Sequence, residues 1–172
     1  NALQEAEVRN QVPELPAENI VAEPARRDTA PAVSLGVALI AARDPQANMI
    51  IIPSDSLILD DDAFRALAED ALSLAGREAA LITIGIKPTW ACPSYGYIER
   101  AGKLEDAALS HNCYEVVRFR EKPDAATAAQ YLASGNFSWN AGMFIWKAET
   151  IREEMEKHMP QVTGMFKGWE RV

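Results

Sequence analysis

The sequence has few cysteines, no excess of basic residues and no apolar run long enough to cross a membrane. Its 172 residues include only Cys92 and Cys113, which lie far apart without metal-type spacing, so a disulfide framework is not indicated. The net charge of -8 disfavours binding to nucleic acid or to an anionic membrane. No stretch approaches the roughly 20 apolar residues of a membrane span, and no basic-then-apolar leader opens the chain. We therefore expect a soluble, cytoplasmic protein with no nucleic-acid or membrane partner.

A glycine-rich phosphate loop is also absent. A doubly wound sheet normally begins with a strand and such a loop, whereas this chain opens on a predicted helix. With 48% hydrophobic residues, the chain is long enough for one domain with its own core. We expect a single domain over residues 1–172 whose N-terminal strands and C-terminal region are missing.

Two continuous apolar strands flank a helix in the middle of the chain. Ile50, Ile51 and Ile52 form an uninterrupted β-branched run, and the segment 79–86 reads as another continuous apolar strand. Strands without polar alternation are covered on both faces, as in parallel sheets, and the helix 60–76 between them is long enough for a right-handed crossover. The sequence thus predicts an α/β fold with a doubly wound, mostly parallel, Rossmann-like sheet. Other predicted elements are helices at 1–12, 31–43, 124–135 and most of 149–172, and strands at 20–21, 94–99, 115–123 and 137–146.

Charged residues follow two of these strands. Asp55 comes just after Pro53, at the carboxyl end of a predicted strand, and ligands commonly bind beyond the carboxyl ends of parallel strands. Asp55 could equally close a turn or cap the following helix. Glu121 and Lys122 would diverge on an extended strand and can serve one ligand only if the backbone turns at Pro123. The alternative is a solvated charge pair.

Polar or small residues interrupt two further strands. Asn140 lies in an otherwise buried run and must be satisfied by a sugar hydroxyl or by a neighbouring strand. Gly96, between two tyrosines, either exposes its N–H to a ligand or forms a bulge. The acidic run Asp60 to Asp62 is expected to cap a helix rather than to hold a metal ion. The tryptophans are expected in a core or an interface: Trp90, Trp146 and Trp169.

Six segments taken in order resemble the motifs of one family. EPARRDTAP, IPSDS, ITIGIKPT, SYGYIE, FREKP and WNAGMF are similar to successive motifs of mannose-1-phosphate guanylyltransferases, over nearly the whole chain. The resemblance implies an enzyme that makes GDP-mannose and pyrophosphate from GTP and mannose 1-phosphate. The implied roles are magnesium binding and catalysis for Asp55, catalysis at the sugar phosphate for Lys122, sugar binding for Gly96, Glu121 and Asn140, and an approach to the base for Arg27, Asp28 and Thr29.

The chain also departs from the family. Asp28 stands where the family has asparagine, and its carboxylate could accept both N1–H and N2–H of guanine or could instead cap the next helix. The family's glycine-rich signature and a second metal-binding aspartate are absent, so the fragment is expected to be inactive alone. Two other functions stay open: a noncatalytic, regulatory subunit that binds a sugar nucleotide, and a metal-dependent glycosyltransferase that uses the acidic run. The resemblance is compatible with a homodimer.

Overall fold

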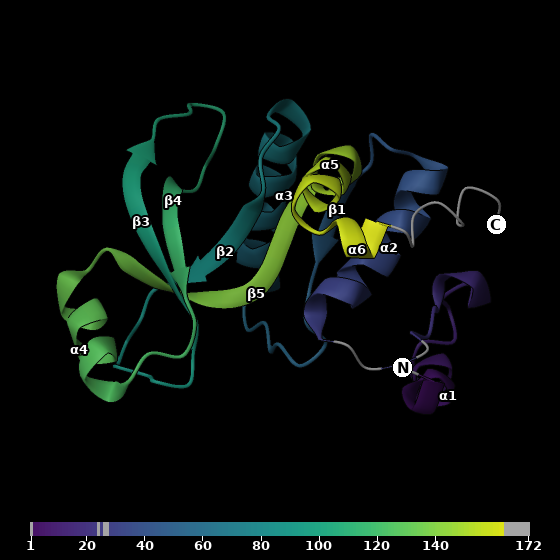
Figure 1. Cartoon of the computed structure of the whole chain (residues 1–172), viewed down its shortest axis with the longest axis horizontal. Helices are drawn as coiled ribbons and strands as arrows, with labels where there is room; N and C mark the ends of the chain where they lie inside the picture. The colour runs from purple at the N-terminus through teal and green to yellow at the C-terminus, as the bar shows by residue number, and fades with distance from the viewer. Residues whose placement is uncertain (1, 24, 26–27, 164–172) are drawn as a thin grey trace. The chain divides into compact units, whose positions relative to one another are not determined.

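The structure is a computed structural model that describes residues 2–23, 25 and 28–163 (Figure 1). The chain falls into two compact units. The first unit comprises residues 1–47 and 151–172, and the second comprises residues 48–150. The expectation of a single domain over residues 1–172 stays a prediction. No helix in the described part of the chain is long and apolar enough to cross a membrane.

The described elements of the first unit are helical. They are α1 (Ala2–Gln11), the 3-10 helix η1 (Ala17–Asn19), α2 (Thr29–Arg43), α5 (Ala148–His158, in this unit from Ile151 on) and α6 (Pro160–Thr163). Ser34 is buried on α2, donates a hydrogen bond to the Ala30 carbonyl over 2.7 Å and lies 3.6 Å from the Met155 sulfur on α5. The short strand expected at Ile20 and Val21 is wrong, because Ile20 caps η1 and the described residues offer it no partner strand.

The second unit is built on a five-stranded sheet. Its strands are β1 (Asn48–Ile51), β2 (Ile82–Ile86), β3 (Tyr97–Leu104), β4 (Cys113–Arg120) and β5 (Phe137–Lys147). Ile145 pairs with both Ile50 and Ile82, so β5 lies between β1 and β2. Trp139, further back on β5, pairs with Tyr97 of β3, and β4 pairs with β3. The long strand β5 therefore joins all parts of the sheet (Figure 1).

The α/β class is confirmed, but the strand pairings differ from the expected mostly parallel ladder. Each pairing in the described sheet is antiparallel. The reason is the position of β5, which separates β1 from β2. These two strands run in the same direction, as the predicted strand, helix, strand crossover requires, but they contact β5 rather than each other.

The two helices of this unit begin at aspartate caps. The Asp60 carboxylate accepts a hydrogen bond from the Ala63 N–H at the start of α3 (Asp61–Arg77), over 2.9 Å. Asp124 does the same for the Thr127 N–H at the start of α4 (Ala125–Ser134), over 2.7 Å, and this bond lowers the pKa of Asp124. Gly135 ends α4 with a φ of 72°, in the left-handed region that glycine adopts readily.

Each of these helices covers part of the sheet with small or aromatic residues. On α3, Ala71 and Ala75 pack against Ile145 of β5, with half-buried aliphatic side chains of β1 and β2 around them. On α4, Ala128 joins the buried rings of Tyr97 and Phe137. Small helical residues let the helix approach the sheet closely, and the resulting contacts hold β5 in the centre of the unit.

Candidate functional site

A bulge in β5 carries the WNAGMF motif. Thr83 of β2 pairs with Phe144, and Gly85 pairs with Asn140, so Ala141–Met143 face a single residue of β2. Gly142, inside the bulge, has a φ of 69°. A side chain there would also meet the Pro53 ring at 3.3 Å. The bulge thus needs glycine, and it brings the motif next to the segment that leads from β1 to Asp55.

The bulge fixes the orientation of the Asn140 amide. Its Oδ1 atom accepts a hydrogen bond from the Gly142 N–H over 3.0 Å and lies 3.4 Å from Thr83 Oγ1. The Thr83 hydroxyl also lies 3.1 Å from the Met143 carbonyl, which can accept its proton. The amide oxygen therefore has its hydrogen-bond partners within the sheet. Of the two alternatives that the sequence left open for Asn140, a sugar hydroxyl or a neighbouring strand, the strand applies to this oxygen. The Nδ2 group has no partner in the described part of the chain and can donate to a ligand.

Gly96 and Glu121 meet Asn140 at one point. The Asn140 N–H donates to the Gly96 carbonyl over 2.8 Å. A Cβ atom added to Gly96 would lie 2.6 Å from Glu121 Oε2 and 3.5 Å from the Asn140 Cβ. The carboxylate of Glu121 thus occupies the space above Gly96 that any other residue would fill. Gly96, Glu121 and Asn140, which were predicted from separate motifs, therefore lie together.

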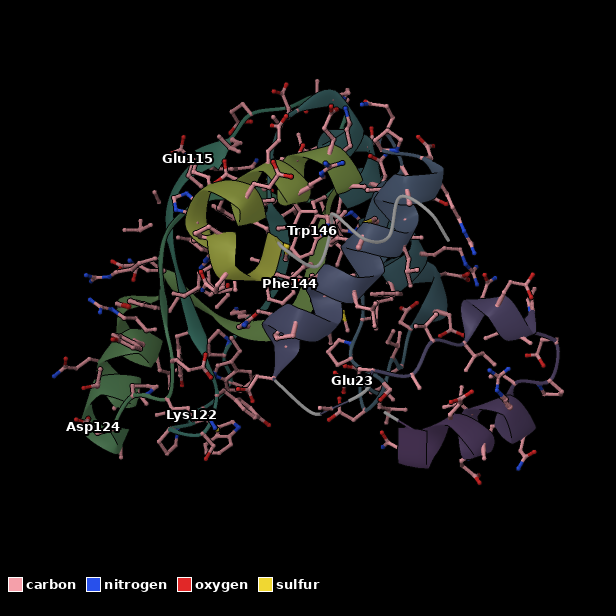
Figure 2. All side chains as sticks on the ribbon, turned by 45° about the vertical axis from the view of Figure 1, so that its right-hand side comes forward. Glu23, Glu115, Lys122, Asp124, Phe144 and Trp146 are labelled. Atoms are coloured by element: carbon pink, nitrogen blue, oxygen red, sulfur yellow. The ribbon has the colours of Figure 1, made fainter. Side chains whose placement is uncertain are left out.

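The backbone turns at Lys122, as joint use of Glu121 and Lys122 requires. Strand β4 ends at Arg120, and Lys122 has a φ of 47°, a left-handed conformation that costs free energy for a residue with a side chain. Lys122 is exposed and forms no ion pair within the described residues. In Figure 2, Lys122 and Asp124 lie close to the start of α4. The ammonium group is therefore available to a ligand.

Asp55 lies in an exposed turn after β1. Its carboxylate makes no hydrogen bond or ion pair within the described part of the chain. The segment that carries Asp55 approaches the bulge of β5 at Pro53, whose ring would lie 3.3 Å from a Cβ atom on Gly142. A single free carboxylate fits Mg²⁺, which uses one or two protein carboxylates together with substrate phosphates and water.

The acidic run at the start of α3 is structural. Asp60 caps the helix, and Asp62 forms an exposed ion pair with Arg65 at 2.9 Å. No group of three metal-binding side chains occurs among the described residues. The expectation that this run caps a helix is confirmed.

The segment expected near the base lies in the first unit. Arg27 is outside the described residues. Asp28 occupies the N-cap position of α2, with φ 62° and ψ -169°, but its side chain makes no capping hydrogen bond. Thr29 is the first residue of this helix. Asp28 is exposed, in a backbone region that residues other than glycine rarely adopt.

The role of Thr83 was not predicted from the sequence, and Trp90, which was expected in a core or an interface, is more exposed than a core residue. Thr83 is a polar residue within the apolar run 79–86, which is the signal that could have identified it. Trp90 is 54% exposed and packs edge-on against Tyr95 and Trp139, with ring centroids 6.4 and 6.3 Å away. Trp146 is buried as expected and stacks on Phe144 (Figure 2), whereas Trp169 lies outside the described residues.

Comparison with known proteins identifies the class. The sequence pattern of the family described as Nucleotidyl transferase matches residues 2–169, and the chain belongs to this family. Among its relatives is the mannose-1-phosphate guanylyltransferase of Escherichia coli (strain K12), 39% identical over 147 residues, which cover 84% of this chain and 30% of the relative. The Xanthan biosynthesis protein XanB of Xanthomonas campestris pv. campestris is 38% identical over 152 residues, covering 88% of this chain and 31% of that protein.

Solved structures agree with the fold. A crystal structure described as mannose-1-phosphate geranyltransferase from Thermus thermophilus matches with a TM-score of 0.80 and 32% identity, over 97% of this chain and 46% of that one. A structure described as mannose-6-phosphate isomerase from Helicobacter pylori matches with a TM-score of 0.77 and 30% identity, over 99% of this chain and 61% of that one. The chain thus spans about a third of the curated relatives named above.

Proposed function

We propose that this chain is the nucleotidyl transferase part of an enzyme that makes GDP-mannose and pyrophosphate from GTP and mannose 1-phosphate. The observation that carries the proposal is the meeting of Gly96, Glu121 and Asn140 at one point of the sheet. Relatives named as mannose-1-phosphate guanylyltransferases support the choice of substrates.

The sugar would be held by complementary hydrogen bonds. Glu121 supplies two acceptor oxygens for hydroxyl groups, and Asn140 supplies donors because its amide oxygen is occupied by the bulge. Gly96 permits close approach and offers its backbone N–H. Because these groups are held by the sheet, they can distinguish sugars by the positions of their hydroxyls.

The phosphate groups would be held by Lys122 and by a metal ion at Asp55. A phosphate oxygen of mannose 1-phosphate attacks the α-phosphorus of GTP, the bond to the β-phosphate breaks, and pyrophosphate leaves. The attacking oxygen is already an anion near neutral pH, so the reaction needs no general base. Lys122 offsets the negative charge of the sugar phosphate and aligns it for attack. When bound at Asp55, Mg²⁺ would neutralise phosphate charge in the transition state.

The base would be met by Arg27, Asp28 and Thr29. The capping role considered for Asp28 is not realised by a side-chain hydrogen bond, which favours the other hypothesis for this residue. Its free carboxylate could accept hydrogen bonds from N1–H and N2–H of guanine in a bidentate manner. A cytoplasmic location and a homodimer stay predictions.

Two competing functions make different predictions. A noncatalytic regulatory subunit would bind mannose 1-phosphate or GDP-mannose but would not turn over in the full-length protein. A glycosyltransferase that uses the acidic run would depend on Asp60 to Asp62. In the structure, Asp60 instead accepts a hydrogen bond from the Ala63 N–H, and Asp62 pairs with Arg65. These contacts disfavour the use of this run as a metal site.

Calorimetry and a turnover assay test the proposal together. We expect mannose 1-phosphate to bind the chain, and Glu121→Gln to weaken this binding about 10-fold or more through the loss of charge-assisted hydrogen bonds. Glu115→Gln, at an exposed glutamate on β4, the strand that precedes Glu121, is the matched control and should bind normally. Magnesium-dependent release of pyrophosphate by the full-length protein would complete the test. Binding that is equal in both variants would contradict the proposed sugar site, and binding without turnover would indicate the regulatory subunit.

A further inference from the structure

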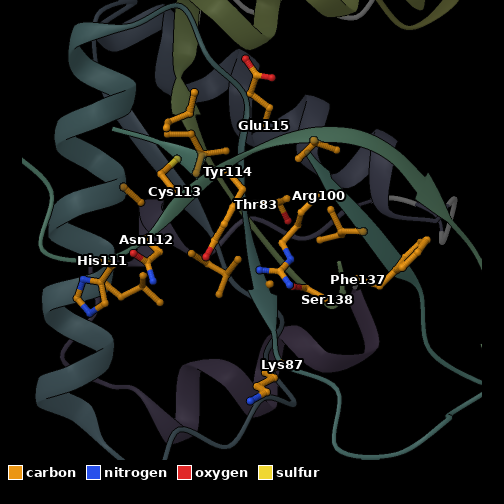
Figure 3. A pocket seen from close by; sticks show the side chains of 18 of the residues that line it. Thr83, Lys87, Arg100, His111, Asn112, Cys113, Tyr114, Glu115, Phe137 and Ser138 are labelled. Carbon is orange, nitrogen blue, oxygen red and sulfur yellow. The ribbon is translucent and has the colours of Figure 1, made fainter. Parts of the chain in front are cut away.

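A hollow in the sheet unit is separate from the proposed sugar site. It has a volume of about 680 Å³ and is lined by residues of α3, β2, β3, β4, α4, the start of β5 and the loop 105–112 (Figure 3). Asp55, Gly96, Glu121, Lys122 and Asn140 do not line it. Pockets that bind small molecules typically have volumes of about 300 to 1,000 Å³. The hollow is therefore large enough for a ligand of its own.

The walls of this hollow are mainly aliphatic and aromatic. Several large apolar side chains that line it are also more than one-third exposed, which leaves apolar surface in contact with water: Leu81, Leu104, Val116 and Leu132. Ile98 and Phe137 are buried beneath them. An occupant with an apolar body would remove this surface from water, which is favourable.

One cation reaches into this apolar hollow. Arg100 donates a hydrogen bond from Nη2 to the Gly135 carbonyl over 2.7 Å, and its guanidinium lies 4.7 Å from the centre of the Tyr114 ring. Its Nε atom is buried and has no hydrogen-bond partner in the described part of the chain. Figure 3 shows the guanidinium in the middle of the pocket, beside Ser138. The described residues also give Nη1 no hydrogen-bond acceptor, so the guanidinium favours a ligand that brings one.

The other charged groups of the lining do not neutralise Arg100. The Asp70 carboxylate is engaged by the His111 ring at 2.7 Å and by the N–H groups of Ser110 and His111, and the His111 bond lowers its pKa. Glu115 lies at the upper edge of Figure 3, with its carboxylate directed away from Arg100, and Lys87 lies at the lower edge. The unsatisfied charge inside the hollow is thus positive.

We propose that this hollow binds a small amphipathic oxyanion, with its carboxylate or phosphate on Arg100 and its apolar body against the aliphatic walls. A planar guanidinium pairs well with either group. The hollow is also linked to Asn140. Thr83 lines it and lies 3.4 Å from the Asn140 amide, so occupancy can change the affinity for the sugar. This coupling rests on the proposed function, whereas binding in the hollow does not.

Titration with decanoate, decyl phosphate and decanol tests the proposal. We expect saturable binding of decanoate or decyl phosphate at one site per chain, and binding of decanol at least 10-fold weaker. The comparison of the two anions identifies which acceptor group Arg100 prefers. Arg100→Gln should weaken anion binding about 10-fold, and Arg65→Gln, at an exposed arginine of α3 outside the hollow, should leave it unchanged.

A second variant covers the case in which Arg100→Gln does not fold. Leu132→Trp would fill the hollow from its half-exposed edge and should also abolish anion binding, while circular dichroism reports on the fold. Absence of saturable anion binding, equal binding of decanol, or equal loss in Arg65→Gln would overturn the proposal. Glu121→Gln should not change decanoate binding, so a failure of the sugar site is distinguishable from a failure of this one.

Discussion

Glu121 and Asn140, which are proposed to bind the sugar, are held differently from Asp28, which is proposed to meet the base. Asn140 lies in the ladder between β2 and β5, and its amide oxygen has two neighbouring donors within the sheet. Asp28 stands before a helix, with a positive φ, and its side chain makes no capping bond. The comparison teaches that the sheet itself organises the sugar side. Changes there should spread to neighbouring residues, whereas changes at Asp28 should affect mainly the ligand.

Loss of the proposed metal ligand should have the largest effect. Asp55→Asn should reduce turnover of the full-length protein by about 100-fold to 1,000-fold, because charge stabilisation of the phosphates is the main catalytic term. Stability should not change, since Asp55 is exposed and its carboxylate is unbonded in the described chain. Steady-state kinetics with thermal unfolding measures both. Asp61→Asn is the control, and a larger loss in the control would favour the glycosyltransferase instead.

A single methyl group should disrupt the sugar side. In Gly96→Ala, the new Cβ would lie 2.6 Å from the Glu121 carboxylate and would force it away. We expect affinity for mannose 1-phosphate to fall about 10-fold to 100-fold, by calorimetry, through the loss of charged hydrogen bonds. Gly102→Ala, on the strand β3 that follows Gly96 and with open space around it, should bind normally. Unchanged affinity in Gly96→Ala would show that Glu121 does not contact the sugar.

Removal of the Thr83 hydroxyl should act indirectly, by loosening the bulge. Thr83→Val keeps the shape but loses the hydroxyl that lies between the Asn140 amide and the Met143 carbonyl. We expect about 3-fold weaker sugar binding and about 1 kcal/mol less stability, with faster hydrogen exchange at the Gly142 amide. Thr83→Ser should restore all three properties. If Ser and Val behave alike, the hydroxyl does not position Asn140.

The smallest effect should be at the base side. Asp28→Asn should reduce the preference of the full-length protein for GTP over ITP by about 3-fold, since an amide accepts fewer hydrogen bonds from guanine than a carboxylate does. The affinity for mannose 1-phosphate should stay the same, because Asp28 is proposed to contact the base and not the sugar. The ratio of kcat/KM values for the two nucleotides measures the effect. An unchanged ratio would dismiss direct reading of guanine by Asp28.

The accuracy of the sequence-based predictions depended on the range of the interaction involved. The cap at Asp60 was anticipated because it depends on residues a few positions away, and a turn after Glu121 was one of the two alternatives that the sequence left open at Pro123. The strand pairing was not anticipated, because β5 lies more than fifty residues further along the chain than the residues of β1 and β2 with which it pairs. Thr83 was overlooked for the same reason: its partners Asn140 and Met143 belong to a distant strand.

The sequence by itself determined where the strands and helices of the sheet unit lie and which residue types can bind a sugar, a phosphate or a metal ion. Apolar runs, caps and turns are local, so their physical causes can be recognised in short segments. The tertiary structure alone decided that Gly96, Glu121 and Asn140 meet, that the bulge holds the Asn140 amide oxygen, and that Arg100 lines an apolar hollow while its Nε atom has no hydrogen-bond partner among the described residues. These features arise from the packing of strands distant in sequence, where side chains acquire neighbours that no local pattern specifies.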